Sequence, residues 1–128
     1  MKPKILIIDD EEDVCVYLKS ILERTGKFEV WATASPGEGI ALAKSNRPDL
    51  ILLDIIMPEM DGTEVAEELQ KTPSTRDILV VFVTVLAKRE DVEGCEGIIC
   101  GHPFLCKTLD REEFIARIES LLHETSAA

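Results

Sequence analysis

Short runs of consecutive apolar residues recur along the chain, and a polar residue ends each of them. Three runs are uninterrupted: Ile5–Ile8 ends at Asp9, Leu50–Leu53 ends at Asp54, and Ile78–Val83 ends at Thr84. These runs are too short to cross a membrane and too continuous for a half-exposed strand, so they predict strands buried on both faces of a sheet. Two further strands are expected at Phe28–Thr33 and Pro103–Cys106.

Amphipathic segments between these runs predict helices. The segment after Asp13 has apolar residues at helical spacing: Val14, Leu18, Ile21 and Leu22. Ser35, Pro36 and Glu38 provide an N-cap, a proline at the first helical position and a capping-box glutamate. They predict a second helix that ends at about Ser45. A third helix is expected over Thr63–Lys71 and a last one after an N-cap at Asp110, with an inward face that contains Phe114, Ile118, Leu121 and Leu122.

The pattern is weakest between the fourth and fifth strands. A helix is expected over Lys88–Ile99, although Gly94 and Gly97 each disfavour it by about 1 kcal/mol relative to alanine. Five strands that alternate with five helices predict an α/β domain with a doubly wound, five-stranded parallel sheet. We expect one domain over residues 1–124 and a frayed tail over residues 125–128.

Composition and charge narrow the classes of function. The chain has 128 residues, 45% of them hydrophobic, which suits one domain of ordinary size. Its 14 basic and 25 acidic residues give a formal charge of -11, which argues against binding to nucleic acid or to an anionic membrane. The chain contains no apolar run long enough for a membrane helix, and its start lacks the apolar core of a signal peptide. These features predict a cytoplasmic protein.

The four cysteines are expected to be reduced thiols: Cys15, Cys95, Cys100 and Cys106. Three of them lie within twelve positions together with His102, which raises the possibility of a zinc or redox site. However, there is no CxxC pair, and Cys100 and Cys106 lie among apolar residues. Packing is therefore the preferred interpretation of these thiols.

Five polar residues follow the ends of four predicted strands: Asp9, Asp10, Asp54, Thr84 and Lys107. The carboxyl ends of parallel strands meet at one edge of a sheet, where open α/β folds bind ligands, so these side chains should converge. Three crowded carboxylates repel one another unless a hard cation lies among them, and Mg²⁺ prefers oxygen ligands. The sequence thus predicts a Mg²⁺ site, with Asp54 beside it as a nucleophile that can accept a phosphoryl group.

These motifs, in this order, resemble the receiver domains of two-component response regulators, from Ile5 to about Leu122. The matching segments are ILIIDDEEDV, DLILLDIIMPEMDGTEV, VVFVT and FLCK. The resemblance implies the flavodoxin-like (βα)5 fold of the chemotaxis regulators, with strand order 2-1-3-4-5. It also implies that Asp54 is the phosphoacceptor. Asp10, Asp54 and the backbone carbonyl of Ile56 would bind Mg²⁺ directly, and Asp9 would act largely through metal-bound water.

The resemblance further implies a phosphate-sensing pair and a switch residue. Thr84 and Lys107 would contact the phosphoryl group, and Phe104 would be the aromatic residue that changes rotamer as Thr84 moves toward the phosphate. Two positions depart from the family pattern. Thr108 follows the lysine where a proline in a cis peptide bond is usual, and Val85 replaces a small residue after the threonine. Val85 is expected to narrow access to the phosphoacceptor.

Two more departures concern hydrolysis and switching. Ile56 and Leu86 flank the site where many receiver domains carry polar groups that position a hydrolytic water, so we expect slow self-dephosphorylation. The segment 97–103 lacks the usual Gly-Ala pattern before the last strand, so the switching surface is the least transferable part of the resemblance.

We therefore predict a phosphoacceptor domain of a two-component phosphorelay. It would take a phosphoryl group from a histidine kinase or a histidine phosphotransfer protein onto Asp54 with Mg²⁺, and then change its binding to a partner. It would catalyse its own phosphorylation and slow dephosphorylation without being a turnover enzyme. The output partner or output domain is not specified, and the chain is expected to be either a stand-alone receiver or part of a longer protein.

Two alternatives come from other classes of function. A pseudo-receiver would bind partners without being phosphorylated, and the departures from the family pattern favour it. A phosphatase of the dehalogenase type is suggested by Asp61-Gly62-Thr63, which resembles part of the DxDGT signature. Glu59 stands where that signature needs its nucleophilic aspartate, and Pro58 is incompatible with a strand there. Asp61-Gly62 is better interpreted as the turn that enters the third helix.

Overall fold

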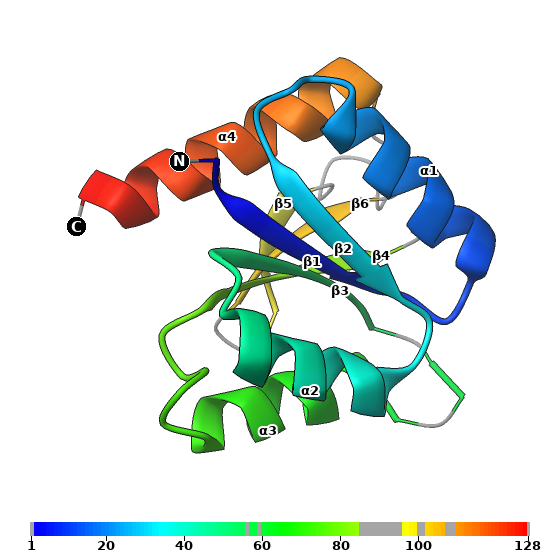
Figure 1. Ribbon diagram of the computed structural model, residues 1–128, viewed down its shortest axis with the longest axis vertical. Helices are drawn as coiled ribbons and strands as arrows, with labels where there is room; N and C mark the ends of the chain where they lie inside the picture. The colour runs from blue at the N-terminus through cyan, green and yellow to red at the C-terminus, as the bar shows by residue number, and fades with distance from the viewer. Residues whose placement is uncertain are drawn as a thin grey trace.

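The computed structural model describes residues 2–55, 57–58, 60–84, 96–99, 102–106 and 110–127. Its elements follow one another in this order: β1 (Lys4–Ile8), α1 (Glu12–Glu23), β2 (Glu29–Thr33), α2 (Pro36–Asn46), β3 (Leu50–Asp54), α3 (Gly62–Lys71), β4 (Leu79–Thr84), β5 (Glu96–Ile99), β6 (His102–Cys106) and α4 (Arg111–Ala127). Figure 1 shows a central sheet between two helical layers, with α1 and α4 on one face and α2 and α3 on the other. Within the described ranges, every helix is too short or too polar to cross a membrane.

The sheet has the strand order β2-β1-β3-β4-β6-β5. The first five strands in this order pair in parallel, through β1 with β2, β1 with β3, β3 with β4, and β4 with β6. Since β6 is the fifth predicted strand, the predicted parallel order 2-1-3-4-5 is confirmed. β5 adds a sixth strand at the edge, antiparallel to β6.

The helix predicted over Lys88–Ile99 is wrong at its end, because Glu96–Ile99 form strand β5. Gly97 disfavours a helix, and the two β-branched residues after it favour a strand. β5 pairs antiparallel with β6, and Ile99 lies opposite His102. Residues 88–95 lie outside the described part of the chain.

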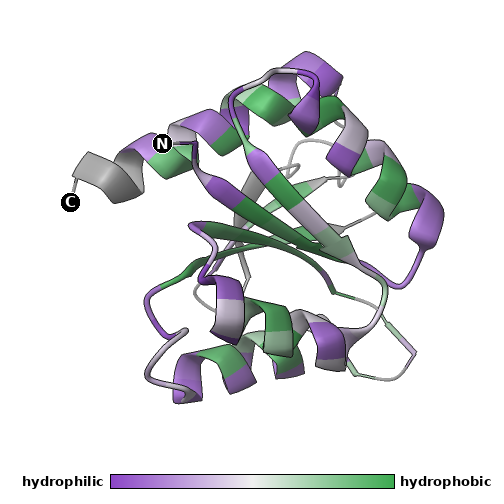
Figure 2. Cartoon of the chain, viewed as in Figure 1, coloured by the Kyte–Doolittle hydropathy of each residue, from purple (hydrophilic) through white to green (hydrophobic). Residues whose placement is uncertain are grey.

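The core has two halves, one on each face of the sheet. Alternate residues of β1 and β3 enter opposite halves, so that Leu50 and Leu52 pack with α1 and α4, and Ile51 and Leu53 pack with α2 and α3. All four side chains are at most 1% exposed, which confirms a strand buried on both faces. Figure 2 shows the same pattern, with the hydrophobic sheet inside and hydrophilic residues on the outer faces of the helices.

The helix ends follow local sequence signals. The Glu38 amide donates to Oγ of Ser35 at 3.3 Å, which confirms the predicted N-cap of α2. Gly26 has a φ of 71°, a left-handed conformation that ends the segment after α1. The Phe114 amide donates to the backbone carbonyl of Asp110 at the start of α4. α4 continues to Ala127, so helix is found where a frayed tail is expected for residues 125–127.

Candidate functional site

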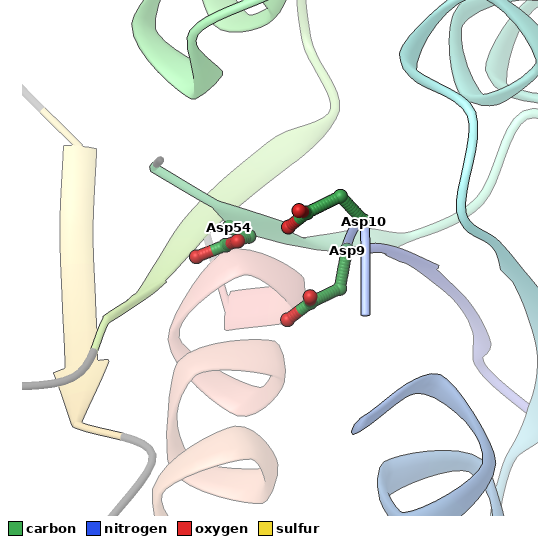
Figure 3. A group of neighbouring side chains, drawn as sticks. All are labelled: Asp9, Asp10 and Asp54. Atoms are coloured by element: carbon green, nitrogen blue, oxygen red, sulfur yellow. The ribbon is translucent and has the colours of Figure 1, made fainter. Parts of the chain in front are cut away.

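Three aspartates meet at the carboxyl edge of the sheet. Asp9 and Asp10 directly follow β1, and Asp54 ends the adjacent parallel strand β3. Because Ile8 pairs with Leu53, the two strands end at the same level and bring these residues side by side. One carboxylate oxygen from each aspartate lies within 4.8 Å of the others. Figure 3 shows the three side chains grouped at this edge.

The aspartate group is largely removed from solvent. Asp9 is 2% exposed and Asp54 6% exposed, whereas Asp10 is half-buried. The residues that precede the two buried acids, Ile8 and Leu53, are fully buried in the core. Charges in such surroundings interact more strongly than charges in water, so three carboxylates placed here favour a bound cation.

The donor set fits Mg²⁺. All three groups offer carboxylate oxygens, the ligands that a hard divalent cation prefers. One oxygen from each of the three groups lies within 4.8 Å of the other two, so the three side chains could hold one ion.

Asp9 is held by contacts with α1 and β2. Its Oδ1 accepts the Glu11 amide at 2.9 Å, and its own amide donates to the Thr33 carbonyl at 3.2 Å. The buried thiol of Cys15 donates to the Asp9 carbonyl at 3.2 Å and lies 3.5 Å from the Thr33 carbonyl. Sequence reasoning missed the contact of Cys15, because only the fold brings it to the end of β1.

The start of α3 is bonded to the residue that follows Asp54. Oδ1 of Asp61 accepts the Thr63 amide at 3.0 Å and the Thr63 hydroxyl at 3.1 Å, which confirms Asp61-Gly62 as the turn that enters this helix. The Gly62 amide donates to the carbonyl of Ile55 at 2.7 Å. The predicted third helix is therefore attached to the residue that follows the candidate phosphoacceptor.

The remaining predicted residues are described in part. Thr84 ends β4 and pairs with Cys106 of β6, at the same edge as Asp54. Phe104 is half-buried and packs against the core half that contains Phe82. Several predicted positions lie outside the described residues, as does the side chain of Thr84: Ile56, Val85, Leu86, Lys107 and Thr108.

The suggested cysteine and histidine site is tested only at His102. The edge of the His102 ring faces Phe82 at 5.5 Å between ring centroids, and burial lowers the pKa of this imidazole. Cys95 and Cys100 lie outside the described residues. Among the residues that the structure describes, the three aspartates form the one group of three or more His, Cys, Asp or Glu side chains able to share a metal ion.

Comparison with protein families gives one match over most of the chain. Residues 5–119 match the response regulator receiver domain family. Two curated relatives are the DNA-binding dual master transcriptional regulator RpaA of Synechocystis, 36% identical over 96% of this chain, and the alkaline phosphatase synthesis transcriptional regulatory protein PhoP of Bacillus subtilis, 30% identical over 100% of it. The match covers 50% and 52% of these relatives, so the chain spans about half their length.

Solved structures show the same fold. A CheY-like receiver domain protein from Methanospirillum hungatei is 28% identical, with a TM-score of 0.81 over 99% of this chain and 98% of that one. The receiver domain of a signal transduction histidine kinase from Syntrophus aciditrophicus is 32% identical, with a TM-score of 0.78 over 95% of this chain and 91% of that one.

Proposed function

The chain belongs to the response regulator receiver domains of two-component systems, and we propose that it accepts a phosphoryl group on Asp54 from a phosphohistidine donor. The donor would be a histidine kinase or a histidine phosphotransfer protein. The observation that supports this proposal is the buried carboxylate of Asp54 at the end of β3, within 4.8 Å of oxygens from Asp9 and Asp10.

The transfer uses Asp54 as the nucleophile. One of its carboxylate oxygens attacks the phosphorus atom while the N–P bond of the donor breaks. The donor imidazole leaves with the electron pair of that bond and takes up a proton, and Asp54 becomes an acyl phosphate. Little further chemistry is needed from the protein, because phosphoryl transfer depends mainly on position and on stabilising charge on the phosphoryl oxygens. The last position of a fully buried strand provides a fixed place for the nucleophile.

The other predicted residues complete the site. Asp9, Asp10, Asp54 and the backbone carbonyl of Ile56 would hold Mg²⁺, which when bound neutralises charge on the acids and on the phosphoryl oxygens. Thr84 and Lys107 would contact the phosphoryl group. Phe104 would follow Thr84 and report phosphorylation to a partner.

The direct test is intact-protein mass spectrometry after incubation with acetyl phosphate and MgCl₂. We expect one added phosphoryl group on the native protein and none on Asp54→Ala. Asp77→Ala, which changes an exposed aspartate, should be phosphorylated as the native protein is. If the native chain gains no phosphoryl mass, the proposed function is wrong and a pseudo-receiver becomes the better interpretation.

Hydrolysis of the phosphorylated form provides a second measurement. We expect slow loss of the phosphoryl group, because Val85 would narrow access and the apolar side chains of Ile56 and Leu86 would not position a water molecule. The added mass should therefore persist well beyond seconds in Mg²⁺ after the donor is removed. A lifetime of only seconds would contradict this part of the proposal.

The output of the switch concerns protein contacts. Phosphorylation would change the binding of this domain to an output domain or to a separate partner. The charge of -11 disfavours contact between this chain and nucleic-acid phosphates, so we assign it the signal-receiving role.

A further inference from the structure

Gly62 lies directly against the backbone of the candidate phosphoacceptor. A Cβ atom at this position would overlap the carbonyl oxygen of Asp54 and lie 2.8 Å from Cα of Ile55. The φ of Gly62 is not positive, so an ordinary L-residue could adopt its backbone conformation. Glycine is therefore required here because there is no room for a Cβ atom, and not because of the backbone conformation.

Neither α3 nor β3 can move away from this contact without losing packing or strand pairing. On the helix side, Val65, Ala66 and Leu69 are at most 2% exposed and fix α3 against the core. On the strand side, β3 is paired along its length with β1 and β4. An added side chain at position 62 would therefore press on the peptide units of Asp54 and Ile55 at the end of β3.

We propose that Gly62 is a positioning residue that keeps Asp54 at the place where its carboxylate can share a metal ion with Asp9 and Asp10. This inference rests on the proposed function, because it gives Gly62 a role in the same site. The carboxylate oxygen of Asp54 lies within 4.8 Å of those of Asp9 and Asp10, so a displaced Asp54 would change the arrangement of all three ligands. The seating of α3 on the Asp54 carbonyl also couples this helix to metal binding at the strand end.

Helix propensity makes the opposite prediction for Gly62→Ala. Gly62 is the first residue of α3, and alanine is a better helix former than glycine. If Gly62 mattered only to the helix, the substitution would leave metal binding unchanged and would not destabilise the protein. The positioning role predicts that the substitution weakens Mg²⁺ binding.

The test compares three glycine-to-alanine variants by titration calorimetry with MgCl₂ and by urea unfolding in EDTA. Gly62→Ala should bind Mg²⁺ about 10-fold more weakly or worse, as is typical when a group that orients a metal ligand is altered. Gly37→Ala is the open control, because its Cβ would meet only Oγ of Ser35, at 4.0 Å. Gly39→Ala is the packing control, because its Cβ would press on the Ile8 side chain. It should lose stability while the protein that remains folded keeps native Mg²⁺ affinity.

A measurement on the native protein decides the matter if Gly62→Ala does not fold. Gly62 and Gly39 both lie in the first turn of a helix, and their amides donate to the backbone carbonyls of Ile55 and Ser35 respectively. Saturating Mg²⁺ should slow hydrogen exchange of the Gly62 amide several-fold and leave that of Gly39 unchanged. Equal responses of the two amides, or native Mg²⁺ affinity in a folded Gly62→Ala, would overturn the positioning role. Failure of the native protein to bind Mg²⁺ would instead overturn the proposed function.

Discussion

The crowding of three carboxylates at one sheet edge predicts that Asp10→Asn stabilises the protein in the absence of Mg²⁺. Two unit charges 4.8 Å apart repel each other by about 3.5 kcal/mol at an effective dielectric constant of about 20 and by about 0.9 kcal/mol in water. Asp10 is half-buried, and its charge faces those of Asp9 and Asp54. Removing the Asp10 charge removes two such pairs, and a value nearer the aqueous limit for each pair gives a gain of about 2–3 kcal/mol.

The effect of Asp10→Asn should shrink or reverse in saturating Mg²⁺. The native protein gains about 2.7 kcal/mol when the free ion is at 100 times its dissociation constant, and a variant that lacks one carboxylate gains less. Urea unfolding followed by the fluorescence of Trp31, the single tryptophan, gives both values when it is done in EDTA and in MgCl₂. Asp77→Asn, at an exposed position, should change stability by less than about 0.5 kcal/mol in either buffer. An Asp10→Asn protein that is less stable than the native one in EDTA would refute the electrostatic reasoning.

Three further predictions concern other parts of the fold. Because burial lowers the pKa of His102 below 6.5, the unfolded state binds more protons just below that pH, so stability should fall as the pH drops through this range. His102→Gln should flatten that part of the pH profile, and an unchanged profile would exclude His102 as its cause. Ser35→Ala should cost about 1 kcal/mol of unfolding free energy, and Ser35→Asp, which keeps an acceptor at the N-cap, should restore it. Leu53→Ala should cost about 2–5 kcal/mol in a urea titration, because this side chain is fully buried beneath the site.

The five parallel strands could be predicted because their residues carry the signal locally. Unbroken apolar runs such as Leu50–Leu53 occur where a strand is covered on both faces, and that holds in the structure. Strand β5 was not predicted, because a crossover between parallel strands usually contains a helix. The signal was present in Gly97, which disfavours a helix, and in the β-branched pair Ile98-Ile99, which favours a strand.

The acidic part of the site could likewise be predicted, because strand ends and their polar residues are visible in the sequence. The contacts that hold these aspartates in place could not be predicted. Cys15 reaches the Asp9 carbonyl only after α1 folds back over β1, and Gly62 meets the Asp54 carbonyl only after α3 packs against the sheet. Such contacts join segments whose spacing in the sequence has no periodic pattern, so only the three-dimensional structure shows them.

The fold tolerates the three acids because burial of strand β3 stabilises the protein by much more than the repulsion among the acids destabilises it. Burying one large aliphatic side chain contributes about 1.5–3 kcal/mol, so the four side chains of Leu50–Leu53 contribute on the order of 6–12 kcal/mol. The repulsion on Asp10 costs about 2–3 kcal/mol, a fraction of that sum. The sheet can therefore hold the carboxylates together without a metal ion, as long as the strand end cannot move aside to relieve the strain. Gly62 and the first turn of α3 prevent that movement. The stability of Asp10→Asn therefore measures the repulsion among the three acids, and the Mg²⁺ affinity of Gly62→Ala measures how well the strand end is held in place against that repulsion.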